Sequence, residues 1–353
     1  MKTSFVSSLA VQTAMRLTIQ QGQSEMVRLQ EEITTGRHAD LGISLGAGAT
    51  RSINLQRELS RMQTLKDTNS IVTQRLSGSQ DALATMVEAA EKVRDTLVSF
   101  RGNDAVDKLS IQKADIQSAM TLFTAAANTS LNGEYLFAGI NTDVRPLADY
   151  NDPAGSAAKA TYQAALSGFM AAQVPPLTAM KDFTGDQMKD FITNTLEPMF
   201  LGGAQWDADW SNASSQNMTS RISTTEVIQS STNVNSDAVR KFALANVIAG
   251  ELLDTDIPSV VRASVSDMAM GYVSEAITGL NAERSALGVS ESRVEKATTS
   301  LEAQIKIITN NKLDLEGIDT YDASVRLTAL KTQIETSYTL TARLQQLSLI
   351  NYL

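Results

Sequence analysis

The placement of proline divides this chain into three parts. All six prolines of the 353-residue chain lie between Pro146 and Pro258. Because a proline inside a helix costs about 3 kcal/mol, the two long proline-free arms are free to be helical from end to end. Both tryptophans, Trp206 and Trp210, also lie in the central part. The sequence therefore predicts two helical arms around a centre of a different kind.

Apolar residues in the first arm recur at alternating steps of three and four, the spacing of one helix face. One run extends from Phe5 to Ile33 and stops before Gly36, a residue type that commonly ends helices. A second helix is expected to begin near residue 50 and to carry apolar side chains from Leu76 to Phe100, ending at Gly102. Both runs have the period of coiled-coil helices.

A third helix is expected to be capped by Asn103-Asp104. It carries four apolar residues on one face: Leu109, Ile116, Phe123 and Ala127. Further along, helical pattern resumes near Ser236, pauses at 254–258 and continues to about Asn310. A last apolar stripe follows from Leu327 to Leu347.

The centre has mixed signals. Asn132-Gly133 is a strong two-residue hairpin turn, and 135–137 is predicted to be a strand. Short helices are expected over 161–170 and 186–196, and the β-branched run 221–228 resembles a strand. The predicted fold is mainly α, with long terminal helices forming a coiled-coil-like bundle and an inserted α+β central domain.

We expect five segments along the chain, of which the first and last are assembly helices. They are an N-terminal assembly helix paired with the C-terminal arm (1–45), a helical bundle with a β-hairpin (46–145), a variable outer α+β domain (146–235), the return of the bundle (236–308) and a C-terminal assembly helix (309–353).

Composition excludes several kinds of site. The chain has no cysteine, so disulfides and thiolate metal sites are absent, and its single histidine, His38, leaves little scope for histidine metal clusters. With 30 basic and 39 acidic residues the net charge is −9, which argues against a nucleic-acid partner. No apolar run approaches the roughly 20 residues of a membrane span, and the N-terminus lacks the apolar core of a cleaved signal peptide.

The excess negative charge lies away from the ends. Residues 1–50 and residues 306–353 each have equal numbers of basic and acidic side chains, whereas 140–235 has five basic and ten acidic. A long neutral arm with one apolar stripe buries only a narrow strip of apolar surface. The free energy gained from that burial is smaller than the conformational entropy cost of ordering the arm. We therefore expect both ends to fold fully only on assembly. The alternative is that both arms pack inside an ordinary large helical bundle.

The same burial argument names nine expected assembly contacts, and Leu349 and Tyr352 of the C-terminal segment are expected to join them. They are Phe5, Ile19, Leu29, Ile33, Leu327, Leu330, Ile334, Leu344, Leu347, Leu349 and Tyr352.

The remaining chemical motifs favour structural roles. The run Gly42–Gly48 lacks the lysine of a phosphate-binding loop and follows no strand, so a flexible joint between helices is expected. His38 lies in polar sequence, where solvation or capping is the usual role. The acidic pairs Asp207/Asp209 and Asp254/Asp256 lack calcium-loop spacing and resemble solvated turns or caps. We expect no catalytic, cofactor or metal site and no enzyme activity.

Three segments resemble the flagellin superfamily and, within it, the hook–filament junction family (hook-associated protein 3). Residues 126–143, AANTSLNGEYLFAGINTD, are similar to that family's "AN…G.YLFAG..TD" segment. The ending 347–353, LSLINYL, is similar to its "LSL.dYL" terminus, and 29–37, LQEEITTGR, resembles a segment shared with flagellins. One departure stands at 39–46, where the family's "psDDP" loop is replaced by ADLGISLG.

The resemblance implies a structural subunit of the bacterial flagellum. It implies a ring of subunits between the first hook-associated protein and the flagellin filament, held by coiled-coil packing of the terminal helices. It further implies export without signal cleavage through the flagellar type III system, with an export chaperone, and an extracellular location. Membrane insertion is not expected.

Three alternatives stay open at the level of sequence. The chain could be a filament flagellin, although 135–139 and 349–353 argue against that. It could carry a carboxylate-dependent hydrolase in its central domain, using Asp207 and Asp209. It could also be a cytosolic coiled-coil binding module.

Overall fold

The structure is a computed structural model of the chain and describes residues 8–100, 106–253 and 257–350. The chain divides into two compact units, Met1–Thr64 with Leu301–Leu353, and Leu65–Ser300. Two long helices, α3 (Gly48–Phe100) and α10 (Ser259–Glu316), contribute residues to both units. The five segments expected from the sequence concern roles in assembly, and that division stays a prediction. The predicted mainly α fold with long terminal helices is confirmed.

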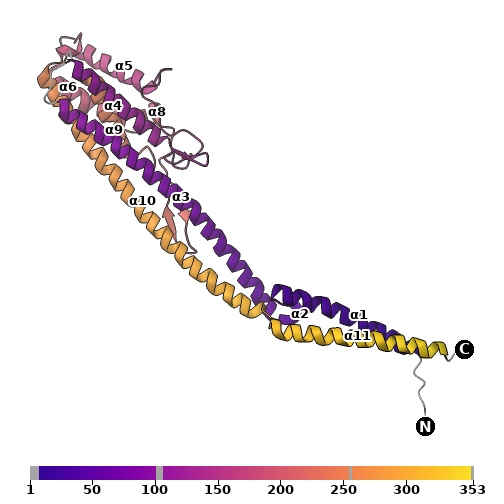
Figure 1. Ribbon diagram of the computed structural model, residues 1–353. Helices are drawn as coiled ribbons and strands as arrows, with labels where there is room; N and C mark the ends of the chain where they lie inside the picture. Colours follow the sequence, from indigo (N-terminus) through magenta and orange to yellow (C-terminus); the bar gives the residue numbers. More distant parts are fainter. Residues whose placement is uncertain (1–7, 101–105, 254–256, 351–353) are drawn as a thin grey trace. The chain divides into compact units, whose positions relative to one another are not determined.

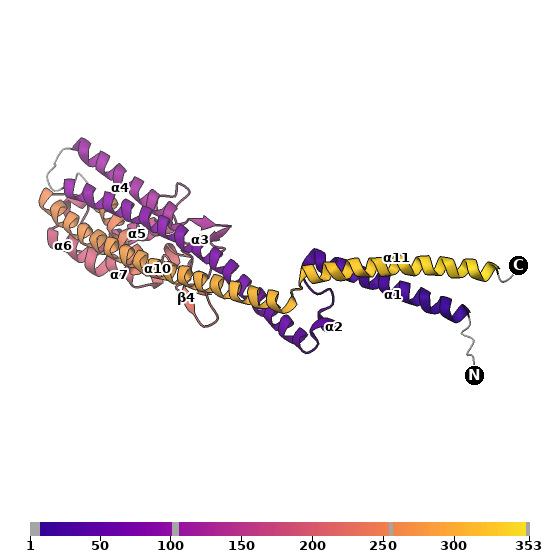
Figure 2. The ribbon, with the colours of Figure 1, turned by 60° about the horizontal axis from the view of Figure 1, so that its bottom comes forward.

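In the first unit, α1 (Ser8–Thr35) and α11 (Thr320–Ile350) lie side by side (Figures 1 and 2). They run antiparallel, since the backbone of Gly36 meets Ile318 at one end while Met15 meets Thr341 further along. Helix α1 ends where the sequence predicts, before Gly36, which has φ +70°. The short helix α2 (Leu41–Leu45) follows.

Helix α2 occupies the glycine-rich run that the sequence predicts to be a flexible joint. It forms because Asp40 caps it: the side chain accepts a hydrogen bond from the Ile43 N–H at 2.9 Å. The run is therefore a capped helical turn that ends at Gly46, where φ is +50°.

In the second unit, α3 and α10 run antiparallel and exchange polar contacts along their length (Figure 2). Asn69 bonds to Thr298 at 3.1 Å, and Gln80 bonds to the carbonyl of Arg284 at 2.7 Å. Helices α4 (Val106–Ala127) and α9 (Asp237–Val247) complete the bundle.

The four residues predicted to form the apolar face of α4, from Leu109 to Ala127, are all buried. Between α4 and α9, the rings of Phe123 and Phe242 stack 3.8 Å apart. The predicted cap Asn103-Asp104 and Gly102 lie outside the described residues. Helix α10 continues past Asn310 to Glu316.

A short hairpin follows α4, with the predicted turn. Strands β1 (Ser130–Leu131) and β2 (Glu134–Tyr135) pair antiparallel, and the turn residues Asn132 and Gly133 have φ of +54° and +86°. The predicted strand 135–137 is wrong beyond Tyr135. The strand ends at Tyr135, and Leu136 and Phe137, both buried, lie in the bend that follows it.

The run 221–228 is likewise two strands rather than one. Strands β3 (Thr219–Arg221) and β4 (Val227–Gln229) pair antiparallel across a turn. The Ser223 hydroxyl closes the turn by accepting the N–H groups of Thr225 and Glu226 at 3.3 and 3.1 Å.

The rest of the centre consists of short helices, as predicted in outline. They are α5 (Ala157–Ala172), η1 (Met180–Asp182), α6 (Gly185–Asp190), the π-helix η2 (Phe191–Leu196), α7 (Glu197–Leu201), α8 (Ala204–Asp209) and the π-helix η3 (Ile248–Leu252). Trp206 and Trp210 are buried among them and stack with 5.4 Å between ring centroids.

Candidate assembly surface

The contact between α1 and α11, here called the seam, uses many of the side chains predicted to hold an assembly together. Ile19, Leu29 and Ile334 are buried, at 9%, 5% and 8% exposure. Ile33, Leu327 and Leu330 are half-buried. These six side chains are thus largely covered within their own chain, and a contact with another copy stays a prediction for them.

The other five predicted contacts cannot be placed in the same way. Phe5 and Tyr352 lie outside the described residues. Leu344, Leu347 and Leu349 belong to α11, whose side chains the structure describes as far as Arg343.

Gly22 of α1 allows side chains of α11 to pack close to the α1 backbone. A methyl group on Gly22 would lie 3.1 Å from Cγ1 of Ile334 and 3.7 Å from Cδ1 of Leu330. In the sequence Gly22 interrupts the apolar run, but in the structure it is a place where Ile334 and Leu330 of α11 pack directly against the backbone of α1. The amide of Gln23 adds a hydrogen bond to the Tyr338 hydroxyl at 2.8 Å.

The face of α11 opposite the seam carries no charge over five turns. At 3.6 residues per turn, seven exposed residues lie along this outer face: Tyr321, Val325, Thr328, Ala329, Thr332, Thr336 and Thr339. Tyr321 is 79% exposed and Val325 52%. A solvent-facing helix surface normally carries charged residues, so this outer face has the composition of a surface that becomes covered.

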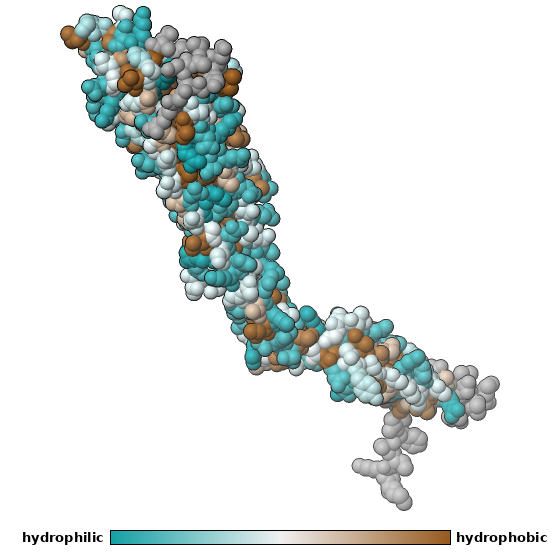
Figure 3. All heavy atoms as spheres, turned by 60° about the vertical axis from the view of Figure 1, so that its left-hand side comes forward, coloured by the Kyte–Doolittle hydropathy of each residue, from teal (hydrophilic) through white to brown (hydrophobic). Residues whose placement is uncertain are grey.

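The threonine hydroxyl groups of the outer face are already hydrogen-bonded within α11. Thr332 donates to the carbonyl of Thr328 at 3.1 Å, and Thr336 donates to that of Thr332 at 2.8 Å. Thr328 and Thr339 likewise bond to carbonyls four residues earlier, at 2.9 and 3.0 Å. Burial of this face would therefore leave the four threonine hydroxyl donors satisfied. In Figure 3 the surface over α1 and α11 is largely pale with brown patches.

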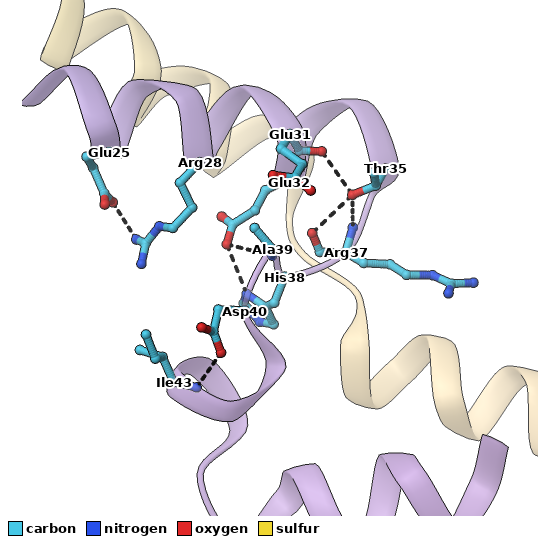
Figure 4. A network of polar contacts seen from close by, with 10 residues as sticks. All are labelled: Glu25, Arg28, Glu31, Glu32, Thr35, Arg37, His38, Ala39, Asp40 and Ile43. Carbon is cyan, nitrogen blue, oxygen red and sulfur yellow. Dashed lines mark hydrogen bonds and ion pairs between the residues drawn. The ribbon is translucent and has the colours of Figure 1, made fainter. Parts of the chain in front are cut away.

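Beyond the seam, the chain turns at an elbow formed by residues 36–40 and 317–319. On the α1 side, Glu32 is 6% exposed. Its Oε1 accepts the Ala39 N–H at 3.2 Å and lies 3.8 Å from Nδ1 of His38 (Figure 4). His38, expected to be solvated or capping, is therefore half-buried against a carboxylate.

In the second unit, the segment 126–143 is held by polar contacts. The side chain of Asn128 bonds both the N–H and the carbonyl of Leu147 at 2.9 Å. Arg75, which is 8% exposed, bonds Glu134 at 2.9 Å and the carbonyl of Tyr135 at 3.0 Å. Burial lowers the pKa of Arg75, and the Glu134 carboxylate opposes that shift. Arg75 thus attaches the hairpin formed by β1 and β2 to helix α3.

Gly139 in the same segment packs directly against the backbone carbonyl groups of Ser214 and Gln216. It has φ +62°, and a methyl group there would lie 2.3 Å from the Ser214 carbonyl oxygen and 2.6 Å from that of Gln216. Glycine is required at this position for both reasons.

The acidic side chains of Asp207 and Asp209 do not share a site. Asp207 lies 4.0 Å from Arg240, whereas Asp209 accepts a hydrogen bond from Gln205 at 2.6 Å. Asp254 and Asp256 lie outside the described residues. Over 8–100, 106–253 and 257–350 no group of three histidine, aspartate or glutamate side chains is placed to hold a metal ion. Within those ranges no helix is both long and apolar enough to cross a membrane.

Two family models match the two ends of the chain. The bacterial flagellin N-terminal helical region matches residues 6–142, and the bacterial flagellin C-terminal helical region matches residues 270–353. Together they cover more than half of the chain. A comparison with curated proteins found no match.

Solved structures with a similar fold include flagellar proteins. One, assigned as a flagellar hook-associated protein from Vibrio parahaemolyticus, superposes with a TM-score of 0.53 at 11% identity, covering 76% of this chain and 97% of that one. FlgL from Bacillus cereus superposes with a TM-score of 0.49 at 11% identity, covering 74% and 99%. The first likeness shows a shared fold. With both flagellin regions matched at the ends that form the α1–α11 pair, the chain belongs to the flagellin family of flagellar structural proteins.

Proposed function

We propose that this chain is the junction subunit between the flagellar hook and the filament, and that it polymerises through α1 and α11. The observation that carries the proposal is the outer face of α11, which is uncharged and exposed and whose threonine hydroxyls bond to their own helix. Such a face can be buried between copies at low desolvation cost. Leu17 and Val27 on α1, exposed at 55% and 62%, extend the apolar surface of the pair.

The junction role, as distinct from a filament role, is supported by two segments of sequence. These are Tyr135–Gly139 and the ending Leu349–Leu353, which resemble junction proteins more closely than flagellins. The proposed partners are other copies of the chain, the first hook-associated protein and flagellin. Export through the type III apparatus with a chaperone, to an extracellular site, completes the proposal.

A charge on the outer face tests the assembly surface. Thr332→Glu is expected to abolish assembly, because a buried carboxylate without a partner costs several kcal/mol. Thr332→Val should assemble normally, since the threonine hydroxyl bonds to its own helix. The readout is the amount of chain in sheared flagella of a complemented deletion strain.

Gln333→Glu is the matched control for that experiment. It adds the same charge at the next residue, which is exposed but points away from the outer face. Normal assembly of Thr332→Glu would mean that the outer face meets water, and the proposed surface would be wrong.

Deletion of the gene separates the junction from the filament role. Loss of a junction subunit should leave hooks that shed flagellin monomers into the medium. Hooks still capped by junction subunits in the deletion strain would instead identify a filament flagellin.

A further inference from the structure

Glu316, the last residue of α10, is a buried carboxylate at the elbow. It is 2% exposed. The Ser52 hydroxyl of α3 donates to its Oε1. Its Oε2 lies 3.5 Å from Nη1 of Arg37 and 3.7 Å from Nζ of Lys312. One carboxylate therefore contacts α3, α10 and the link that leaves α1.

Backbone hydrogen bonds around Glu316 join the two segments of the elbow, 36–40 and 317–319. The Glu316 carbonyl accepts the His38 N–H at 3.0 Å, and the Ile318 N–H donates to the Gly36 carbonyl at 3.1 Å. Arg37 and Gly317 pair as an antiparallel bridge between these two bonds. The link from α1 to α2 and the link from α10 to α11 are thus held as one unit.

Each of the two links contains a glycine, Gly36 in the first and Gly317 in the second. Gly36 has φ +70° with open space where a side chain would be. At Gly317 a methyl group would lie 2.5 Å from the Leu313 carbonyl oxygen. Hinges consist of a few such residues between rigid elements, and here the buried carboxylate belongs to the residue directly before Gly317 and contacts the residue directly after Gly36.

We propose that Glu316 is a latch that fixes the direction in which the α1–α11 pair leaves the ends of α3 and α10. Without its side-chain contacts the pair pivots about Gly36 and Gly317. The inference rests on the proposed function, because a subunit that polymerises through this pair needs it held in one direction. Glu316 acts as a positioning residue, through its contacts within the elbow.

The latch can be tested on the isolated full-length chain with two spin labels. The chain has no cysteine, so Val27→Cys on α1 and Arg57→Cys on α3, both exposed, give a specific label pair. Pulsed electron resonance then measures the distribution of distances between the labels. This experiment takes α1 and α11 to be paired in the isolated chain, as the structure describes them, and not to fold only on assembly. On that basis we expect one narrow distribution in the parent and a broad or shifted one in Glu316→Gln.

Amide hydrogen exchange gives a second readout of the same variant. Exchange at residues 36–40 and 317–319 should become about tenfold faster when the buried charge-assisted contacts are lost. Glu335→Gln is the matched control, since it makes the same change at an exposed position of α11. It should alter neither readout.

A narrow, unshifted distance distribution in Glu316→Gln would overturn the latch, as would equal broadening in Glu335→Gln. If circular dichroism shows that Glu316→Gln does not fold, Ser52→Ala decides, because it removes one donor and keeps the carboxylate. Broadening in Ser52→Ala supports the latch, and an unchanged distribution overturns it. Since the labels report on the unassembled chain, failure of the assembly proposal would appear separately, as normal assembly of Thr332→Glu.

Discussion

Gly139 and Gly133 have similar backbone angles in different surroundings. Both have positive φ, but a methyl group on Gly133 would meet open space, whereas one on Gly139 would strike two carbonyl oxygens. Gly139→Ala is expected to cost about 3 kcal/mol of unfolding free energy, from strain and overpacking together. Gly133→Ala should cost about 1 kcal/mol, from strain alone. Urea unfolding of the two variants measures the difference, and equal losses would refute the close approach at Gly139.

Glu283 gives the second prediction at the scale of residues. Burial raises the pKa of this α10 carboxyl. A hydrogen bond from the Thr232 hydroxyl at 2.8 Å lowers the pKa but does not cancel the effect of burial. Because the folded pKa is the higher one, the folded state binds the proton more tightly, and stability falls as pH rises above the unfolded pKa of about 4.3. Glu283→Gln should therefore be more stable than the parent at pH 7, with a difference that shrinks toward pH 4. Urea midpoints at the two pH values test this, and a difference that grows on acidification would contradict it.

At the scale of elements, the packing of α1 against α11 is expected to depend on Gly22, which leaves room for Ile334. Gly22→Leu is expected to push α11 away from α1, since even a methyl group there meets Ile334 at 3.1 Å. Amide exchange over 8–35 should then be at least tenfold faster, as for a clash of about 1.4 kcal/mol or more. Ser24→Leu adds the same bulk at an exposed position of α1 and should have no such effect. Equal protection in both variants would show that the seam adapts to bulk.

At the scale of the whole molecule, the two units are expected to differ in independence. The second unit contains the buried aromatic cluster around Trp206, whereas the first is held mainly by its helix pair and elbow. Removal of residues 1–45, or of 310–353, should abolish polymerisation and leave the second unit folded. Both tryptophans lie in that unit, so their emission reports on it alone. A shift of the emission to that of exposed tryptophan, together with loss of helix by circular dichroism, would contradict this.

Much of the helical framework follows from local pattern. The apolar spacing and the glycine at 36 predict α1, the buried face of α4 is legible from Leu109 to Ala127, and Asn132-Gly133 predicts its turn. The repeat of hydroxyl residues every four positions from Ser324 to Thr336 is also visible in the sequence, though its meaning depends on which face of α11 is covered. Periodicity reports how residues lie on one element, because backbone geometry fixes it.

The partners of those faces were decided only by the tertiary structure. Glu316 and Ser52 are 264 positions apart, and no local pattern indicates that a carboxylate at the end of one helix will be buried against a hydroxyl near the start of another. Gly22 breaks an apolar run in the sequence, but in the structure Ile334 packs directly over it. Leu136 and Phe137 lie beyond the end of the strand and are both buried in the core, which the strand-like sequence did not indicate. A side chain's burial and hydrogen bonds depend on what packs against it, and in this chain the packing partners come from opposite ends.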